Sequence, residues 1–337
     1  MRARVSPACS GAVVAAVTRR AARVIAVLAL SMLAGCSVAP GRVADTRPLD
    51  PGRLPPPTAT LEVAHLRSCT DAPDRALHLD PDRPVTVLVH GCDASAGRFR
   101  SLAQLYAFHG QQAVCFEYDD RRSLVRVADE LTNALDELAA RTRSPRLTVI
   151  GHSMGGLVAR KAMEQVPARA TGAAEVRLAT VSAPIAGIRS ARACASGLLR
   201  WLTLGAMPGL CWMITGDNWT EITAASPFIR EPAPLDTAVR SYLKVVTDER
   251  GTCRRRNARG ACVESDHVFT LDEQYHPVIE RYPRLVNVEV DAGHAAIVGT
   301  ADRPPVELVS VLQRHGLLAA TPPARRDALR RLLAELY

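Results

Sequence analysis

Residues 147–157 read LTVIGHSMGGL, an apolar, β-branched run that stops at Gly151 and is followed by one serine between small residues. The run before Gly151 is typical of a buried strand, and MGGLVAR after the serine is typical of the start of a helix. Glycines on both sides of the serine leave room for a tight, strained turn. The pattern therefore predicts a strand–turn–helix unit that presents the Ser153 hydroxyl as a nucleophile.

The alternation of strand and helix continues on both sides of this unit. Continuous apolar runs, typical of strands buried on both faces, occur at 85–90, 112–118, 146–151, 176–182, 242–247 and 285–290. Apolar residues recur at helical spacing at 99–110, 124–141, 154–165 and 325–337. We expect residues 61–337 to form one α/β domain, a mainly parallel sheet flanked by helices. The basic last helix is expected to pack its apolar side on the core.

The segment Gly151-His152-Ser153-Met154-Gly155 matches the pattern G-x-S-x-G. In its strand-to-helix context it resembles the nucleophile elbow of the α/β-hydrolase superfamily, in particular the lipase and esterase branch. The resemblance covers residues 84–300 and implies the α/β-hydrolase fold. It also implies an oxyanion hole made by the backbone N–H groups of Cys92, just after the first of these strands, and Met154.

The resemblance also implies a catalytic histidine after the last strand of the sheet. His294 in VEVDAGHAAIVG holds that place, and it would take the proton of Ser153. Two residues compete for the acid. Asp266 lies in ESDHVF, similar to a D-G-x-V stretch of bacterial lipases, and Asp248 ends the run YLKVVTD. We favour Asp266, which precedes His294 by 28 residues.

These roles imply a serine hydrolase that cleaves carboxylic esters, of lipids or other acyl compounds, through an acyl-enzyme. Neither a cofactor nor a metal is expected, since no two cysteines lie two to four residues apart and the histidines are scattered. An acyltransferase or amidase with the same triad is one alternative. The other is a lipoprotein that uses the fold only for binding, because a fold alone implies no activity.

The insertion at 184–240 separates two of the predicted strands and carries the three tryptophans of the chain, Trp201, Trp212 and Trp219. Its apolar, aromatic composition predicts a helical lid or acyl-binding cap over the strand ends. The alternative is an ordinary helical pair packed on the core.

The first 35 residues have the layout of a secretory signal, with TRRAAR before the apolar run VIAVLALSML and LAGC at the end. Leu33-Ala34-Gly35-Cys36 resembles the lipobox of bacterial lipoproteins, which implies lipid attachment at Cys36. Ser37 then suggests the outer membrane, and the proline-rich residues 36–60 predict an extended tether. The alternative is an ordinary signal peptide with an incidental cysteine.

The net charge of +8 depends largely on this N-terminal segment, whose first 35 residues hold five arginines and no acidic residue. The rest of the chain has a net charge of +3, so no nucleic-acid partner is predicted. Among the remaining cysteines of an exported chain we expect disulfides. Cys253 is predicted to pair with Cys262, Cys194 with Cys211, and Cys69 with either Cys92 or Cys115.

Overall fold

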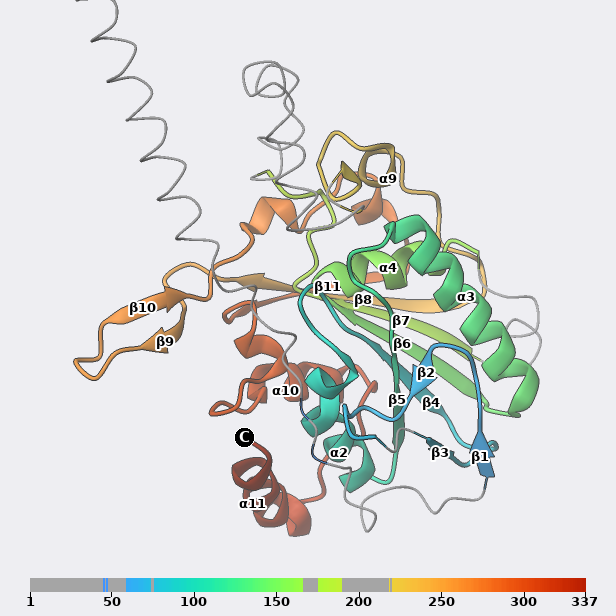
Figure 1. The fold of residues 1–337 in the computed structure, drawn as a ribbon, viewed down its shortest axis with the longest axis horizontal. Helices are drawn as coiled ribbons and strands as arrows, with labels where there is room; N and C mark the ends of the chain where they lie inside the picture. Colours follow the sequence, from blue (N-terminus) through green and yellow to red (C-terminus); the bar gives the residue numbers. More distant parts are fainter. Residues whose placement is uncertain are drawn as a thin grey trace, which may run out of the picture. The chain divides into compact units, whose positions relative to one another are not determined.

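A seven-stranded sheet forms the centre of the protein, in the order β11-β8-β7-β6-β4-β5-β2 (Figure 1). This computed structural model describes residues 45, 47, 59–73, 76–165, 175–189, 218 and 220–337. The strands are β2 (Leu66–Arg67), β4 (Val85–Val89), β5 (Gln112–Phe116), β6 (Arg146–His152), β7 (Glu175–Val181), β8 (Val239–Asp248) and β11 (Leu285–Asp291). All neighbouring strands are parallel except β2, which runs antiparallel to β5.

The sheet confirms the predicted fold class, and each of the six predicted strands is present within one to three residues at either end. Every residue of β4 is buried, as expected for a strand covered on both faces. Two hydrophobic clusters, one containing Val87 and the other Leu88, receive successive side chains of this strand. Successive residues of a strand point to opposite faces, so the two clusters are the cores of the two faces of the sheet.

Helices cover both faces of the sheet (Figure 1). The helices α3 (Leu124–Arg141) and α4 (Met154–Ala162) belong to one cluster, and α2 (Arg100–Phe108), α10 (Val306–Arg314) and α11 (Arg326–Leu336) belong to the other. The last helix packs as predicted: Leu332 and Leu336 are buried, and the Ser101 hydroxyl donates to the Leu336 carbonyl at 3.2 Å.

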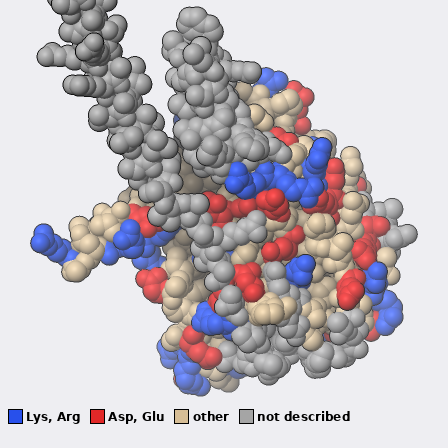
Figure 2. All heavy atoms as spheres, viewed as in Figure 1, with Lys and Arg blue, Asp and Glu red and all other residues tan. Residues whose placement is uncertain are grey.

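The smaller elements lie at the edges and in the connections. They are β1 (Ala59–Leu61), β3 (Leu77–Leu79), η2 (Ala96–Phe99), α9 (Pro227–Arg230), β9 (Cys253–Arg256), β10 (Cys262–Ser265), η4 (Leu271–Glu273), η5 (Ile279–Arg281), η6 (Ala296–Val298) and η7 (Pro323–Arg325). The antiparallel hairpin β9–β10 projects from the body, and basic side chains gather at its tip (Figures 1 and 2).

Two disulfides lie in the described part of the chain. Cys253–Cys262 closes the β9–β10 hairpin, as predicted, and Cys69–Cys115 ties the segment after β2 to β5. The second bond selects one of the two partners left open for Cys69, and within the described residues Cys92 is a free cysteine.

Several predicted features lie outside the described residues: the signal peptide at 1–35, the lipidated Cys36, most of the tether, the Cys194–Cys211 pair, and the tryptophans Trp201, Trp212 and Trp219 of the cap. Within the described ranges, no helix combines the length and the apolar character that crossing a membrane requires.

Candidate active site

Ser153 stands at the junction of β6 and α4, where the sequence predicts a strained turn. Its backbone has φ +57° and ψ −130°, in the left-handed half of the map that a residue with a side chain rarely occupies. The N–H of Ser153 donates to the carbonyl of Val181 at 2.9 Å, which fixes the turn against the end of β7. The neighbouring strand β7 therefore holds the turn.

The glycines of the elbow are required by close packing. A Cβ atom on Gly155 would overlap the carbonyl oxygens of Val89 and His90, and one on Gly151 would overlap the backbone of Gly155. Helix α4 can therefore approach the end of β4 only with glycine at these positions. The steric reason predicted for the two glycines is confirmed.

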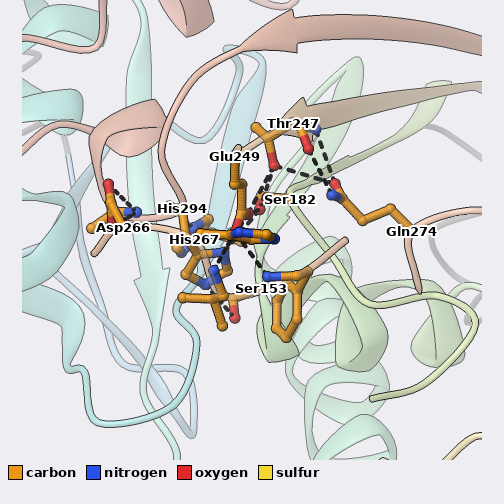
Figure 3. Close-up of polar contacts among 12 residues, drawn as sticks. Ser153, Ser182, Thr247, Glu249, Asp266, His267, Gln274 and His294 are labelled. Atoms are coloured by element: carbon orange, nitrogen blue, oxygen red, sulfur yellow. Dashed lines mark hydrogen bonds and ion pairs between the residues drawn. The ribbon is translucent and has the colours of Figure 1, made fainter. Parts of the chain in front are cut away.

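His294 reaches Ser153 from the loop after β11. Its Nε2 lies 3.0 Å from Ser153 Oγ, and its Nδ1 lies 3.0 Å from Oε1 of Glu249. Glu249 is the first residue after β8 and is only 1% exposed. Hydroxyl, imidazole and carboxylate thus form one hydrogen-bonded series at the carboxyl ends of three strands (Figure 3).

Glu249, and not the predicted acid Asp266, lies against the His294 imidazole, which corrects the predicted contact. The Asp266 carboxylate lies to one side of the series (Figure 3), where it accepts from the backbone N–H groups of Ala295 and Ala296 at 3.0 Å each. It also accepts from Arg254 Nε at 3.0 Å, while its own carbonyl accepts from the N–H of His294 at 2.9 Å. Asp266 therefore holds the backbone of the histidine loop and does not contact the imidazole.

The alternative acid, Asp248, also points away from the imidazole. Its carboxylate pairs with Arg250 at the surface, and hydrogen bonds from Arg250 lower the pKa of Asp248 to about 2. Asp248 and Glu249 are neighbours at the end of β8, so their side chains point in opposite directions. The predicted alternative, Asp248, is thus the residue next to Glu249, and its side chain lies on the other face of the strand.

The buried Glu249 carboxylate is ionised because donors surround it. Burial alone raises its pKa, but the hydrogen bond and charge of His294, the Phe269 amide and the Ser182 hydroxyl together outweigh burial and lower it. One oxygen, Oε2, accepts from the N–H groups of Val268 and Phe269 at 2.6 and 2.8 Å. Those two amides fix the carboxylate, which leaves Oε1 for the imidazole.

The residues predicted to form the oxyanion hole lie beside each other. The thiol of Cys92 donates to Met154 Sδ at 3.2 Å, so the end of β4 and the start of α4 meet next to Ser153. The segment that follows β5 holds the turn after β4, because Tyr118 donates to the His90 carbonyl at 2.6 Å and Asp120 accepts from the N–H of Asp93. Cys92 in this turn and Met154 at the start of α4, the two predicted donors, therefore lie together near Ser153.

His152, the residue before Ser153, hydrogen-bonds to the loop that carries His294. Its Nε2 donates to the carbonyl of His294 at 2.9 Å, and the two rings lie 4.8 Å apart. Phe269 contacts the other side of the His294 ring edge-on, at 4.7 Å between centroids. Burial, followed by repulsion from His294, Arg98 and Arg254, lowers the pKa of His152 well below its usual value. His152 is therefore neutral in the folded protein.

Because His152 is neutral in the folded protein, we expect the protein to lose stability in mild acid. In the unfolded chain His152 takes up a proton below about pH 6.5, whereas the folded protein excludes it, so stability falls as pH decreases through that value. His152→Gln, which retains an N–H donor, is expected to reduce the slope of unfolding free energy by up to about 1.4 kcal/mol per pH unit. Urea unfolding of both proteins at about pH 7, 6 and 5 measures this. Equal slopes would rule the assignment out; His109 and His276, whose pKa values burial also lowers, are common to both proteins.

The comparisons with known proteins agree with this architecture. Residues 80–213 match the family model "Serine aminopeptidase, S33", a segment that holds Cys92, Ser153 and Met154 but ends before Glu249 and His294. No curated protein matches the chain.

Lipases and esterases are among the solved structures to which the chain is similar. The propeptide form of the Bacillus licheniformis lipase BlEst2 is 16% identical, with a TM-score of 0.52 over 76% of this chain and 53% of that one. Its mature form is 17% identical, with a TM-score of 0.49 over 72% and 94%. The Pyrococcus furiosus esterase Pf2001 is 16% identical, with a TM-score of 0.45 over 82% and 97%. At these identities the likeness concerns the fold. By its sheet order, its strand–turn–helix unit at Ser153 and the family match over residues 80–213, the chain has the α/β-hydrolase fold.

Proposed function

We propose that the protein is a serine hydrolase that cleaves carboxylic esters of acyl compounds, with Ser153 as nucleophile, His294 as general base and Glu249 as the acid. The observation that carries this proposal is the series from Ser153 Oγ through His294 to the buried, ionised Glu249. Such a series is what a serine needs to become a nucleophile at neutral pH.

The reaction would follow from this geometry. His294 Nε2 takes the proton of Ser153 as the hydroxyl attacks the ester carbonyl, and Glu249 stabilises the imidazolium that forms. The backbone N–H groups of Cys92 and Met154 receive the oxyanion at the start of α4, where the helix dipole adds positive potential. Imidazolium then protonates the leaving alcohol, and water hydrolyses the acyl-enzyme by the same route in reverse.

The substrate class rests on the sequence of the insertion at 184–240. Its three tryptophans in an apolar context favour an acyl chain as the group that binds there. The lipobox-like Leu33-Ala34-Gly35-Cys36 favours attachment to an outer membrane through lipidated Cys36, next to acyl lipids. We therefore propose a membrane-anchored lipase or esterase that requires no cofactor.

A fluorophosphonate probe tests the enzymatic proposal. The folded wild-type protein is expected to form one covalent adduct, mapped by mass spectrometry to Ser153. The probe phosphonylates serines that an adjacent base activates, with loss of fluoride. An absence of labelling in protein with a cooperative unfolding transition would contradict an active nucleophile and favour a binding role.

A series of acyl esters from acetyl to palmitoyl, run beside matched anilides, tests the substrate class. Longer acyl chains are expected to give higher kcat/KM, because each additional buried methylene contributes ~0.8 kcal/mol. A preference for acetyl esters would contradict an acyl-binding cap. Faster cleavage of the anilides would indicate an amidase, and transfer of the acyl group to an added alcohol in preference to water would indicate an acyltransferase.

A further inference from the structure

Ser182 lies between the acid and the base of the candidate site. It follows β7 directly, is completely buried, and has φ +45°, in the left-handed region that L-residues avoid. Its backbone N–H donates to the carbonyl of Val245 at 2.9 Å, which anchors this conformation to β8. A strained residue in a packed interior persists only where the surroundings hold it, and such residues concentrate at functional sites.

The Ser182 hydroxyl contacts both members of the proposed acid–base pair (Figure 3). Its Oγ lies 2.7 Å from Glu249 Oε1 and 2.9 Å from His294 Nδ1. A second buried hydroxyl, on Thr247, donates to Ser182 Oγ at 2.8 Å. Ser182 thus touches the two groups whose protonation states the proposed mechanism requires.

The directions of these hydrogen bonds follow from what each group can donate. An ionised carboxylate only accepts, so the Ser182 O–H donates to Glu249 Oε1. The Thr247 O–H has two acceptors in reach, Ser182 Oγ at 2.8 Å and the same Glu249 Oε1 at 3.0 Å. His294 Nδ1 then faces two acceptors, Glu249 Oε1 and Ser182 Oγ. This arrangement requires the proton of the neutral imidazole to reside on Nδ1, which leaves the lone pair of Nε2 directed at Ser153.

We propose that Ser182 is a positioning residue of the site: its hydroxyl holds the Glu249 carboxylate ionised and aligned and fixes the His294 tautomer that can accept the Ser153 proton. The inference rests on the proposed function for its catalytic meaning, but the hydrogen bonds it concerns exist in the resting protein.

Removal of the hydroxyl has two opposing effects on the affinity of His294 for a proton. Loss of the donor to Glu249 makes the carboxylate more basic and raises the imidazole pKa, whereas loss of the acceptor at Nδ1 lowers it. The donor contact is the shorter, at 2.7 Å, and joins a hydroxyl to a full charge. Hydrogen bonds to a charged acceptor are roughly twice as strong as neutral ones. The imidazole is therefore expected to bind a proton more tightly in the Ser182 variants than in the wild-type protein.

Other charged and titratable groups lie around the loop that carries His294, on neighbouring elements. They are His152 at the end of β6, Arg98 in η2, Arg254 in β9 and Asp266 after β10. None of them hydrogen-bonds to Ser182 among the contacts of the described residues, so a substitution at Ser182 leaves their own contacts in place.

The matched control for Ser182 is Thr180, two residues earlier, in β7. Thr180 is also completely buried, and its hydroxyl makes a 3.0 Å hydrogen bond with the Tyr242 hydroxyl, outside the acid–base pair. Thr180→Val therefore also removes a fully buried, hydrogen-bonded hydroxyl. Ser182→Ala and Ser182→Gly both remove the hydroxyl under test, and glycine in addition adopts φ +45° without strain, so that a fold intolerant of alanine is still tested.

The experiment is an NMR titration of the His294 ring in the purified full chain, with the signal assigned by its loss in His294→Gln. Both Ser182 variants are expected to raise the His294 midpoint by roughly one pH unit, a tenfold gain in proton affinity, while Thr180→Val leaves it unchanged. An unchanged or lowered midpoint in the Ser182 variants, or an equal rise in Thr180→Val, would overturn the proposal.

This readout needs no substrate, so it separates the two proposals. If the wild-type protein hydrolyses no ester and takes up no phosphonate, the proposed function fails, whereas the titration still decides the role of Ser182. If it is active, the acid limb of its kcat/KM profile is expected to move by the same interval in Ser182→Ala and Ser182→Gly, with kcat reduced roughly tenfold.

Discussion

Replacing Ser153 with Ala is expected to lower kcat/KM for acyl esters by roughly 10⁴–10⁶-fold and to abolish phosphonate labelling. No other hydroxyl takes the place of Ser153 Oγ, 3.0 Å from His294 Nε2, among the contacts of the described residues. Retention of more than about 1% of the activity would mean that another group attacks the substrate. Cys92, an exposed free thiol beside Met154, would be the first to examine.

Ser153→Gly separates the catalytic from the conformational role of this residue. Both variants lack the hydroxyl and should be inactive, but glycine adopts φ +57° without steric cost. We expect Ser153→Gly to be more stable than Ser153→Ala by about 1 kcal/mol in urea unfolding, because the left-handed strain is removed and only part of the gain is lost to chain entropy. Equal stability of the two variants would show that the turn stores no strain.

The central sheet was predictable because burial on both faces leaves a strong signal in sequence. All five residues of β4 are buried, and a short run of this composition between turn residues is typical of a strand in that environment. The edge elements gave no such signal. Strands β1 and β3 are three residues long, and the β9–β10 hairpin is polar and mostly exposed. The pairing of β1 with β3 joins residues as far apart as Ala59 and Leu79, which local patterns do not encode, and the exposed hairpin has no buried face to set a period in its sequence.

The elbow and His294 were predictable for a different reason, since the motif and its steric demands are local. The acid was not predictable, because contact with the imidazole depends on which face of β8 a side chain occupies. If the position of a residue along a strand is misjudged by one, its side chain is assigned to the opposite face of the sheet. One signal was present: Asp248 and Arg250 lie two residues apart, share a face and pair with each other, which leaves Glu249 on the opposite face.

Asp266 shows how a correct observation can lead to a wrong role. It is buried and next to the histidine loop, as the spacing to His294 implied, yet its carboxylate binds backbone amides. A sequence pattern reports that a carboxylate is near the loop but not which atoms it contacts. The placement of Ser182 between Glu249 and His294 was equally inaccessible, since it requires β7, β8 and the loop after β11 to be brought together.

Glu249→Gln is expected to lower kcat/KM by roughly 10³–10⁴-fold without unfolding the protein. The N–H groups of Val268 and Phe269 face Oε2, so the carbonyl oxygen of a glutamine would take that place and turn its NH₂ toward His294. An NH₂ group opposite Nδ1 favours the tautomer with the proton on Nε2. That imidazole donates to Ser153 and cannot accept its proton, so the base is disabled while the packing is preserved.

Asp266→Asn and Asp248→Asn are the matched controls, since each removes one carboxylate charge near the same loop. Asp266→Asn is expected to cost about 2–3 kcal/mol of stability, because two backbone donors and Arg254 lose a charged acceptor, with activity reduced less than about 100-fold. Asp248→Asn, at the surface beside Arg250, should change the free energy of unfolding and the activity only slightly. Because only Glu249 contacts the imidazole, the order of activity loss among the three variants identifies the acid, and a larger loss in Asp266→Asn would restore that residue to the role.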